Sequence, residues 1–327
     1  MATLPITVIS TVLNEARDIS RLVESLLALD PAPAQVIIVD GGSTDGTWEI
    51  LDEAQRVNSL LRAIRDESCS LRFTPGPISR GRNVAIAAAT TPYIACVDAG
   101  CSYQTDWLAR IAAPLLDGQA RYALGGSCLA LDDATVWDLA SAPFLGVKLS
   151  PDVVSKSCTA RSTAFTRELW AEIGGFPEHT FLSEDTLFDL EARRRTPPAF
   201  VTARAYYHPR NSYSSACRQL GRYAAGDGGL GVRKSRLARN LARCVVEIAA
   251  LGLLYWTWIP LAVIVVLELY FAFERDRLQG RATPAAILAR IAYAFSAPWV
   301  VATGYLRGAL ARSKPVASPH NATGPAD

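Results

Sequence analysis

Short apolar runs alternate with segments of helical period over the first 130 residues of the chain. The runs PITVISTV and QVIIVD predict strands, and the amphipathic segment at 16–29 between them predicts a helix. Further helices are expected from Thr47 and at 80–89, ahead of the strand-like run TPYIACVDAG. Such alternation is typical of a parallel sheet with helices on its faces. We therefore expect an α/β fold in which a mostly parallel sheet is flanked by helices.

Two aspartates follow strands of this predicted sheet. Asp40 ends the second apolar strand, ahead of GGSTDGT, and Asp98 ends TPYIACVDAG. Ligands of open α/β sheets bind outside the carboxyl ends of the strands, so the two carboxylates could converge on one ligand. Each could equally well cap its own turn. The pattern leaves both interpretations open.

The regular alternation ends near Gly118. ARYALGGSCLAL and SKSCTARSTAF predict further strands, and residues 167–173 predict a helix that stops at the turn GGFP.

The last third of the chain is far more apolar. Residues 248–267 form a run of 20 without a charge, which is long enough to cross a hydrocarbon core of about 30 Å. A second run of 16 at 291–306 spans only if the flanking Arg290 and Arg307 extend to the membrane surface. We predict a two-helix membrane hairpin over 245–310. A buried helical hairpin of a soluble domain is the open alternative.

The basic residues are unevenly distributed along the chain. The net charge of +2 argues against a nucleic-acid partner, but basic residues gather in a juxtamembrane segment at 226–244. Basic residues also follow the second run, so both flanks suit the cytoplasmic side, although the connecting ERDRLQGR weakens this assignment. The tail at 311–327, rich in small residues and proline, is expected to be disordered.

The N-terminus and the cysteines favour a cytoplasmic first domain. MATLPITVISTVLNEARD lacks the regions of a signal peptide. The seven cysteines form no C-x-x-C pair, which indicates neither a disulfide framework nor a zinc site. With three histidines in the chain, any metal would be held by oxygen ligands. We expect an inner-membrane protein whose first domain lies in the cytoplasm.

Several motifs occur in a fixed order between residues 4 and 225. TVLNEA, VDGGSTDGT and GRNVAI come first, and VDAGCSYQTDWL, IGGFPE, SEDTLFDLEAR and RQLGRY follow. In this order they resemble the motifs of family 2 glycosyltransferases, in particular bacterial exopolysaccharide transferases with C-terminal membrane helices. The resemblance implies a Rossmann-like GT-A catalytic domain over 1–225. It also implies inverting transfer of a sugar from a nucleoside diphosphate to a hydroxyl.

The resemblance assigns the donor site. It implies that Glu15 and Asp40 contact a nucleoside, with UDP-sugars favoured, and that Arg82 lies nearby. A surface helix residue is the alternative for Arg82. Asp98 would bind the ribose or the metal side of the sugar nucleotide, because carboxylates accept hydrogen bonds from base and ribose donors.

One departure concerns the metal. The resemblance implies a second acid two residues after Asp98, but Gly100 stands there and has no ligand to offer. Mg²⁺ or Mn²⁺ could still bind through Asp98, the diphosphate and water, with lower affinity.

The catalytic residues are also implied by the resemblance. Asp185 would be the base that takes the proton of the acceptor hydroxyl, and Glu184 would orient the acceptor or the loop. Adjacent carboxylates raise the pKa of each other, which suits a base near neutral pH. Alternatively, both acids merely begin a helix, where acids favour the first turn.

The acceptor side follows from the last motif. Gln219, Arg222 and Tyr223 resemble the family's acceptor element, and Arg210 could help to stabilise the diphosphate. The basic segment beyond them would lie at the membrane surface, which suggests a lipid-linked saccharide acceptor in cell-surface or exopolysaccharide synthesis. Two alternatives are a catalytically silent scaffold that binds nucleotide sugars, encouraged by Gly100, and a nucleotidyltransferase, which would need a phosphate loop that residues 13–16 do not supply.

Overall fold

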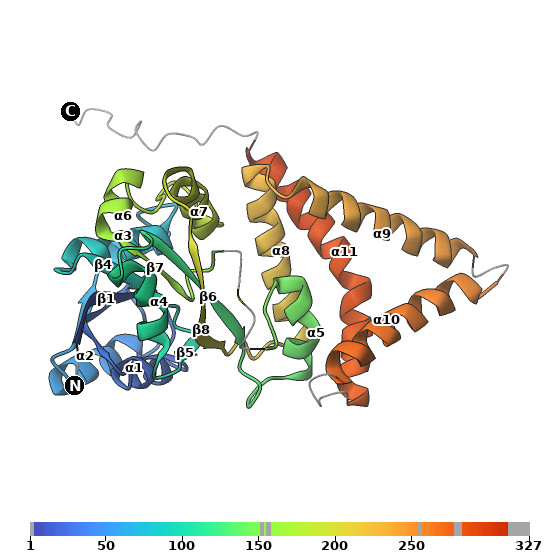
Figure 1. Ribbon diagram of the computed structural model, residues 1–327. Coiled ribbons are helices and arrows are strands. Elements are labelled where there is room, and N and C mark those ends of the chain that lie inside the picture. Colours follow the sequence, from blue (N-terminus) through green and yellow to red (C-terminus); the bar gives the residue numbers. More distant parts are fainter. Residues whose placement is uncertain (1–2, 151–153, 155–157, 254–256, 278–282, 313–327) are drawn as a thin grey trace, which may run out of the picture. The chain divides into compact units, whose positions relative to one another are not determined.

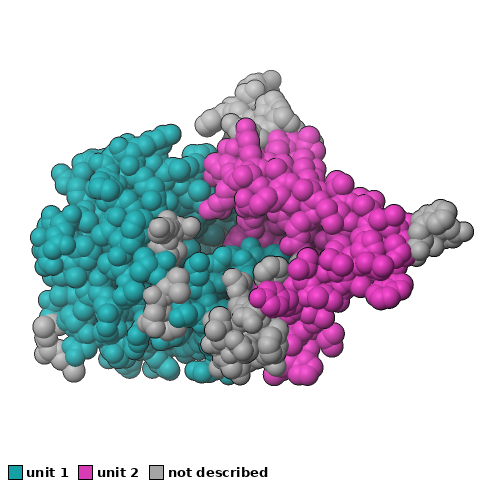
Figure 2. All heavy atoms as spheres, turned by 45° about the vertical axis from the view of Figure 1, so that its right-hand side comes forward, with its two compact units in different colours: residues 1–211 teal, residues 212–327 magenta. Residues whose placement is uncertain are grey.

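The computed structural model describes residues 3–150, 154, 158–253, 257–277 and 283–312. The chain divides into two compact units, Met1–Asn211 and Ser212–Asp327, which are coloured separately in Figure 2. The first unit carries the sheet, and the described part of the second is helical.

One eight-stranded sheet forms the centre of the first unit (Figure 1). Its order is β3-β2-β1-β4-β7-β6-β8-β5. The strands β1 to β4 are parallel, whereas β7 runs antiparallel to both of its neighbours and β5 runs antiparallel to β8. The sheet is therefore mixed beyond β4, where the predicted alternation becomes irregular. The strand bounds are β1 Thr3–Val12, β2 Ala32–Asp40, β3 Leu61–Arg65, β4 Tyr93–Cys96, β5 Cys101–Tyr103, β6 Tyr122–Leu129, β7 Thr163–Thr166 and β8 Ala199–Tyr207.

Helices cover both faces of this sheet. Even-numbered residues of β1, such as Ile6 and Val8, pack in one cluster with α1, α2 and α4, while Ile9 packs on the other face with α3, α6 and α7. This division follows from the alternation of side chains along a strand. The helix bounds are α1 Ile19–Leu27, α2 Thr47–Val57, α3 Pro77–Ala88, α4 Trp107–Leu116, α5 Val136–Leu145, α6 Arg167–Ile173 and α7 Glu184–Arg195, with a 3-10 turn η1 at Glu67–Cys69.

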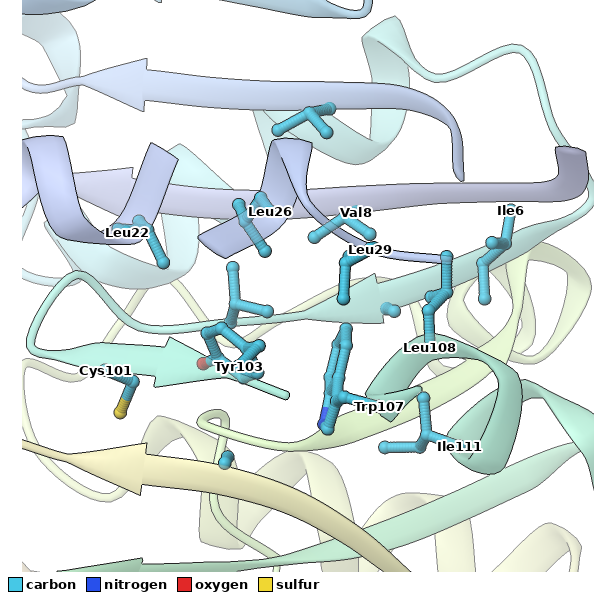
Figure 3. Close-up of a cluster of buried hydrophobic side chains, with 14 of the residues drawn as sticks. Ile6, Val8, Leu22, Leu26, Leu29, Cys101, Tyr103, Trp107, Leu108 and Ile111 are labelled. Carbon is cyan, nitrogen blue, oxygen red and sulfur yellow. The ribbon is translucent and has the colours of Figure 1, made fainter. Parts of the chain in front are cut away.

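Trp107 lies at the centre of the first cluster (Figure 3). Its ring is fully buried, with the centroid 4.6 Å from that of Tyr103, and its Nε1 donates a hydrogen bond to Ser162 Oγ at 2.9 Å. Leu26 of α1 and the following Leu29 belong to the same cluster. The tilted aromatic pair packs β5 against α4, the two elements that follow Asp98 in the chain.

Four helices make up the described part of the second unit: α8 Tyr213–Leu230, α9 Lys234–Leu253, α10 Ile259–Arg277 and α11 Pro284–Arg312. Glycines let α8 and α11 approach closely. A Cβ at Gly228 would lie 2.0 Å from the carbonyl oxygen of Tyr305, and one at Gly308 would lie 1.9 Å from that of Ala225. Side chains larger than hydrogen would therefore separate the two helices.

Two buried acids of this unit, Asp227 and Glu247, are paired. Asp227 is 1% exposed and accepts from Arg233 and Arg236 at 2.8 and 3.1 Å. Glu247 of α9 accepts from Trp299 Nε1 of α11 at 2.7 Å. These contacts join α8, α9 and α11 into one packed group.

The prediction of a single spanning helix over 248–267 is wrong. The run is divided between α9 and α10, and Thr257 and Trp258 lie outside both helices. Pro260 explains the division, because proline is tolerated in the first turn of α10 but would break a hydrogen bond in the interior of one continuous helix. Within the described residues, Pro284–Ala311 is the one helix long and apolar enough to cross a membrane. It includes the predicted second run at 291–306.

The other predicted segments have different outcomes. Residues 226–244 do not form a separate element, since they end α8 and begin α9. Most of the expected disordered tail, residues 313–327, lies outside the described residues.

Candidate active site

The loops after β1 and β2 are hydrogen-bonded to each other at the carboxyl edge of the sheet. Asn14, with a φ of 57°, accepts at its side-chain oxygen from the Thr44 N–H at 2.9 Å and donates its own N–H to Ser43 Oγ at 2.8 Å. The Glu15 N–H donates to Thr47 Oγ1 at 2.8 Å. This pairing fixes the backbone that presents Glu15.

Asp40 lies beneath these loops. Its side chain is fully buried, and its carboxylate accepts hydrogen bonds from the Ser43 N–H at 3.0 Å and from the Ser43 hydroxyl. Through Ser43 the carboxylate supports the Asn14 backbone. The predicted contact of Asp40 with a nucleoside stays a prediction, and the structure places it under the loop that carries Glu15.

Arg82 connects the predicted donor and catalytic residues. It lies on α3 with a side chain 5% exposed, so it is not a surface helix residue. Its Nη1 donates to Glu184 Oε1 at 2.9 Å and its Nη2 to Asp98 Oδ1 at 3.3 Å. Burial alone would lower the pKa of Arg82, but Glu184 and Asp98 raise it above its usual range. The guanidinium is therefore a fixed positive charge between two acids that are 86 positions apart, 98 and 184.

Asp185 follows Glu184 in the chain, but unlike Glu184 it has no ion pair with Arg82. Its carboxylate accepts from the Thr186 N–H at 2.7 Å, and no ion pair reaches it within the described part of the chain. Burial, followed by the charge of Glu184, raises the pKa of Asp185 to about 6, although Arg82 lowers it. Sequence reasoning gave the neighbouring acid as the cause, whereas burial is the larger one. An acid with this pKa can take up a proton near neutral pH.

Glu15 and Asp98 belong to the same electrostatic group. Burial raises the pKa of Glu15, and the charges of Asp18, Asp98 and Asp45 act in the same direction while Arg17 opposes them. Asp98 also contributes to the raised pKa of Asp185. The charge of Asp98 thus acts on both Glu15, in the loop after β1, and Asp185, in the first turn of α7.

A second arginine, Arg161, faces Asp98. Its Nε lies 3.9 Å from Asp98 Oδ2, and its guanidinium carbon lies 3.9 Å from the centroid of the Tyr207 ring. The Tyr103 hydroxyl donates to the Arg161 carbonyl oxygen at 2.8 Å and accepts from the Asp98 N–H at 3.1 Å. One tyrosine therefore holds the backbones of Arg161 and Asp98 together.

Asn83 anchors the GGFP turn next to this group. Its side-chain oxygen accepts from the Phe176 N–H at 2.8 Å, and its side-chain nitrogen donates to the Phe176 carbonyl oxygen at 2.9 Å. The Phe176 ring lies against the Arg82 guanidinium, 5.4 Å from centroid to carbon. Asn83 therefore positions the ring that covers Arg82.

The residues around Asp98 do not form a protein metal site. Gly100 offers no ligand, and among the described residues no three side chains of His, Cys, Asp or Glu are grouped to hold an ion. Arg82 and Arg161 both face the Asp98 carboxylate. A divalent cation could use Asp98 only as a single protein carboxylate, and it would approach two positive charges.

The predicted acceptor residues belong to both units. The guanidinium of Arg210 donates from Nε to Asp133 Oδ2 at 2.9 Å, in the first unit. Gln219, Arg222 and Tyr223 are on α8 in the second unit, where Gln219 Nε2 donates to the Tyr223 hydroxyl at 3.3 Å and Arg222 is exposed. The structure therefore does not test their role at the acceptor.

Comparison with known proteins identifies a family for part of the chain. Residues 7–169 match the family described as "Glycosyl transferase family 2". The chain carries a family 2 glycosyltransferase domain. The matched range contains Glu15, Asp40, Arg82 and Asp98 and ends before Glu184 and Asp185.

One relative is similar over part of the chain. It is 37% identical over 109 residues to the succinoglycan biosynthesis protein ExoA of Rhizobium meliloti (strain 1021), which is 32% of this chain and 30% of that relative. The match thus spans about a third of each protein.

Solved structures are similar over more of the chain. The mannosyltransferase PcManGT from Pyrobaculum calidifontis, in complex with GDP-Man and Mn²⁺, covers 94% of this chain and 86% of its own, with 19% identity and a TM-score of 0.51. TarS 1-349 of S. aureus, in complex with UDP-GlcNAc, covers 67% and 66%, with 18% identity and a TM-score of 0.47. The chain has the GT-A fold, as expected.

Sequence reasoning missed two kinds of residue at this site. Arg161 and Tyr207 belong to no motif, and only the folded chain brings them to Asp98. Asn14 and Thr44 lie within recognised motifs, but their mutual hydrogen bond had no sequence signal. The available hint was that Asn tolerates a positive φ better than other residues with a side chain.

Proposed function

We propose that the glycosyltransferase moves a sugar from a nucleoside diphosphate, with UDP favoured, to a hydroxyl of its acceptor with inversion. The observation that carries this proposal is the Arg82 guanidinium, which joins Asp98 on the donor side to Glu184 beside Asp185. One fixed positive charge thus holds a donor-binding acid next to a general base.

The reaction is a single displacement. The acceptor oxygen attacks the anomeric carbon while the bond from that carbon to the diphosphate oxygen breaks, and the nucleoside diphosphate leaves with the bonding electrons. The Asp185 carboxylate takes the hydroxyl proton. Its raised pKa of about 6 leaves it mostly ionised at neutral pH, yet basic enough for the transfer. Glu184 is held by Arg82 and positions the start of α7.

Donor binding falls to the acids around Arg82. In this proposal Glu15 contacts the nucleoside, the buried Asp40 acts on the same side of the donor through the Ser43 loop that it supports, and Asp98 accepts from the ribose. The hydrogen-bonded loops at Asn14 and Ser43 support that task by fixing the backbone beside Glu15. No step is assigned to a metal, since the donor set around Asp98 does not form a site for one.

We place the acceptor at a membrane. The apolar helix Pro284–Ala311, the basic residues at the start of α9 and the name of the Rhizobium relative support a lipid-linked saccharide of exopolysaccharide or cell-surface synthesis. Arg222 and Tyr223 of α8, with Gln219, would contact that acceptor, and Arg210 would assist at the diphosphate. The catalytic domain would face the cytoplasm, at the inner membrane.

A donor screen tests this function. Membranes containing the full chain are supplied with UDP- and GDP-sugars, and nucleoside diphosphate release is measured with polyisoprenyl-linked and with soluble acceptors. We expect release with one donor class, dependence on the lipid-linked acceptor, and inverted anomeric configuration of the product by NMR. Retained configuration would exclude the single displacement, and an equal rate on soluble acceptors would exclude the lipid preference. A silent scaffold would release no nucleoside diphosphate with any donor.

A further inference from the structure

The site lacks the second acid that usually helps to hold a metal, and Gly100 stands in its place. Nothing in the fold forces a glycine there. A Cβ at Gly100 would lie 3.5 Å from Tyr207 Cε2, which is an ordinary contact. The backbone φ of Gly100 is not positive, so a residue with a side chain could adopt it. Neither backbone conformation nor contact with a Cβ therefore requires the glycine, and the missing acid is a chemical feature of the site.

Arg161 provides a positive charge at the same place. Its side chain is 12% exposed, its guanidinium stacks on Tyr207, and its Nε lies 3.9 Å from Asp98 Oδ2. Tyr103 fixes its backbone through the carbonyl oxygen at 2.8 Å. A stacked, backbone-anchored guanidinium loses little further freedom when it binds a phosphate.

Arg82 is less suited to this task. It is buried with two acids as hydrogen-bond partners, Glu184 at 2.9 Å and Asp98 at 3.3 Å. Reaching a diphosphate would break the closer of these pairs. Arg161 lies at the same carboxylate, 12% exposed and stacked on Tyr207, so it can meet a diphosphate there without breaking the pairs of Arg82.

We propose that Arg161 binds the donor diphosphate and stabilises the charge that develops on it, so that donor binding and transfer need no divalent metal. The inference rests on the proposed function and adds the residue that replaces the cation. Guanidinium nitrogens match phosphate oxygens in pairs, and the growing negative charge of the leaving diphosphate is what such a group stabilises.

Calorimetry on the purified full chain tests the metal requirement. Binding of UDP and GDP is measured in EDTA and in excess Mg²⁺ or Mn²⁺, alongside sugar-nucleotide turnover in the same buffers. We expect the dissociation constant and the turnover of the wild type to differ by less than about threefold between these conditions. The reason is that Arg161, and not a metal ion, binds the diphosphate in this proposal. Turnover that requires a metal would overturn the inference and leave the proposed function standing. No turnover in any buffer would refute the proposed function as well.

Substitution of Arg161 tests the residue. Arg161→Ala should weaken nucleoside diphosphate binding in EDTA at least about tenfold, and Arg161→Lys should fall between Ala and wild type because it keeps the charge but not the fork. The matched control is Arg193→Ala, since Arg193 also faces a ring, that of Phe200, and pairs with Asp189 on α7. Equal binding by Arg161→Ala and wild type would overturn the inference. If Arg161→Ala does not fold, nucleoside diphosphate binding by Arg161→Lys and by the wild type in EDTA still tests the inference.

A gain of metal response provides the converse test. Gly100→Asp restores the second acid in a position with space for it. We expect Mg²⁺ or Mn²⁺ to strengthen UDP binding of this variant at least about fivefold, while the wild type stays unresponsive. A wild type that responds as strongly as the variant would contradict the proposal.

Discussion

Replacing Arg82 by glutamine should destabilise the first unit more than any other single charge removal on α3. The guanidinium is 5% exposed and faces Glu184, which is 12% exposed, and Asp98, which is 36% exposed. Removing one partner of a buried ion pair costs about 3–5 kcal/mol, because the other charge stays buried and unpaired. Asp98 is partly solvated, so the lower end applies, and Arg82→Gln should cost about 3 kcal/mol.

The assay is thermal unfolding followed by circular dichroism at pH 7.5. A loss of about 3 kcal/mol in a unit of this size lowers the melting temperature by about 6–12 °C. The matched control is Arg80→Gln on the same helix. Its ion pair with Glu178 is 3.4 Å long between side chains that are 40% and 38% exposed, so we expect a loss below about 1 kcal/mol.

The same variant should change the titration of Asp185. Arg82 lowers the pKa of Asp185, so its removal should raise that pKa above about 6 and move the acidic limb of the rate profile to higher pH. Equal melting temperatures for Arg82→Gln and wild type, or equal losses for the Arg80 and Arg82 variants, would refute the reasoning that Arg82 is the centre of the site.

Three further predictions follow from the same contacts. In the wild type, kcat/KM measured against pH should rise through about pH 6 as Asp185 ionises, and a flat profile between pH 5 and 7 would exclude this base. Because the pKa of Asp185 is raised on folding, ionisation of this carboxyl destabilises the folded state. Asp185→Asn should therefore stabilise the protein by up to about 3 kcal/mol in urea unfolding at pH 8. The gain should disappear below about pH 4, where Asp185 is protonated in both the folded and the unfolded state. Gly81→Ala should destabilise by about 1–3 kcal/mol, because its Cβ would lie 2.1 Å from Thr11 Oγ1, and adding Thr11→Ala should recover part of that loss in the same urea assay.

Local patterns were sufficient for β1, β2 and β4 of the sheet, but they missed β3 at Leu61–Arg65. The strand at 3–12, the helix from Thr47 and the positions of Asp40 and Asp98 after their strands agree with the structure. These elements are predictable because their strands are buried on both faces and read as continuous apolar runs. The helix at 184–195 has no apolar stripe, so its sequence suggested only that two acids might begin it.

The limits of sequence reasoning are clearest at Arg161 and at Pro260. Arg161 contacts Asp98 and Tyr207, which are distant in sequence, so no local pattern could select it among the arginines. The uncharged run at 248–267 suggested one helix because hydropathy ignores backbone hydrogen bonds. Pro260 was the one local signal for the observed division into α9 and α10.

The most direct test of the account separates donor binding from transfer in Asp185→Asn, with Glu191→Gln on the same helix as control. Glu191 is 40% exposed and pairs with Arg195, so its loss should leave both properties unchanged. For Asp185→Asn we predict UDP binding within about threefold of wild type and transfer reduced about 10²–10⁴-fold, as expected for loss of a general base. Transfer at the wild-type rate in the folded Asp185→Asn variant would contradict the central claim that this carboxylate takes the acceptor proton.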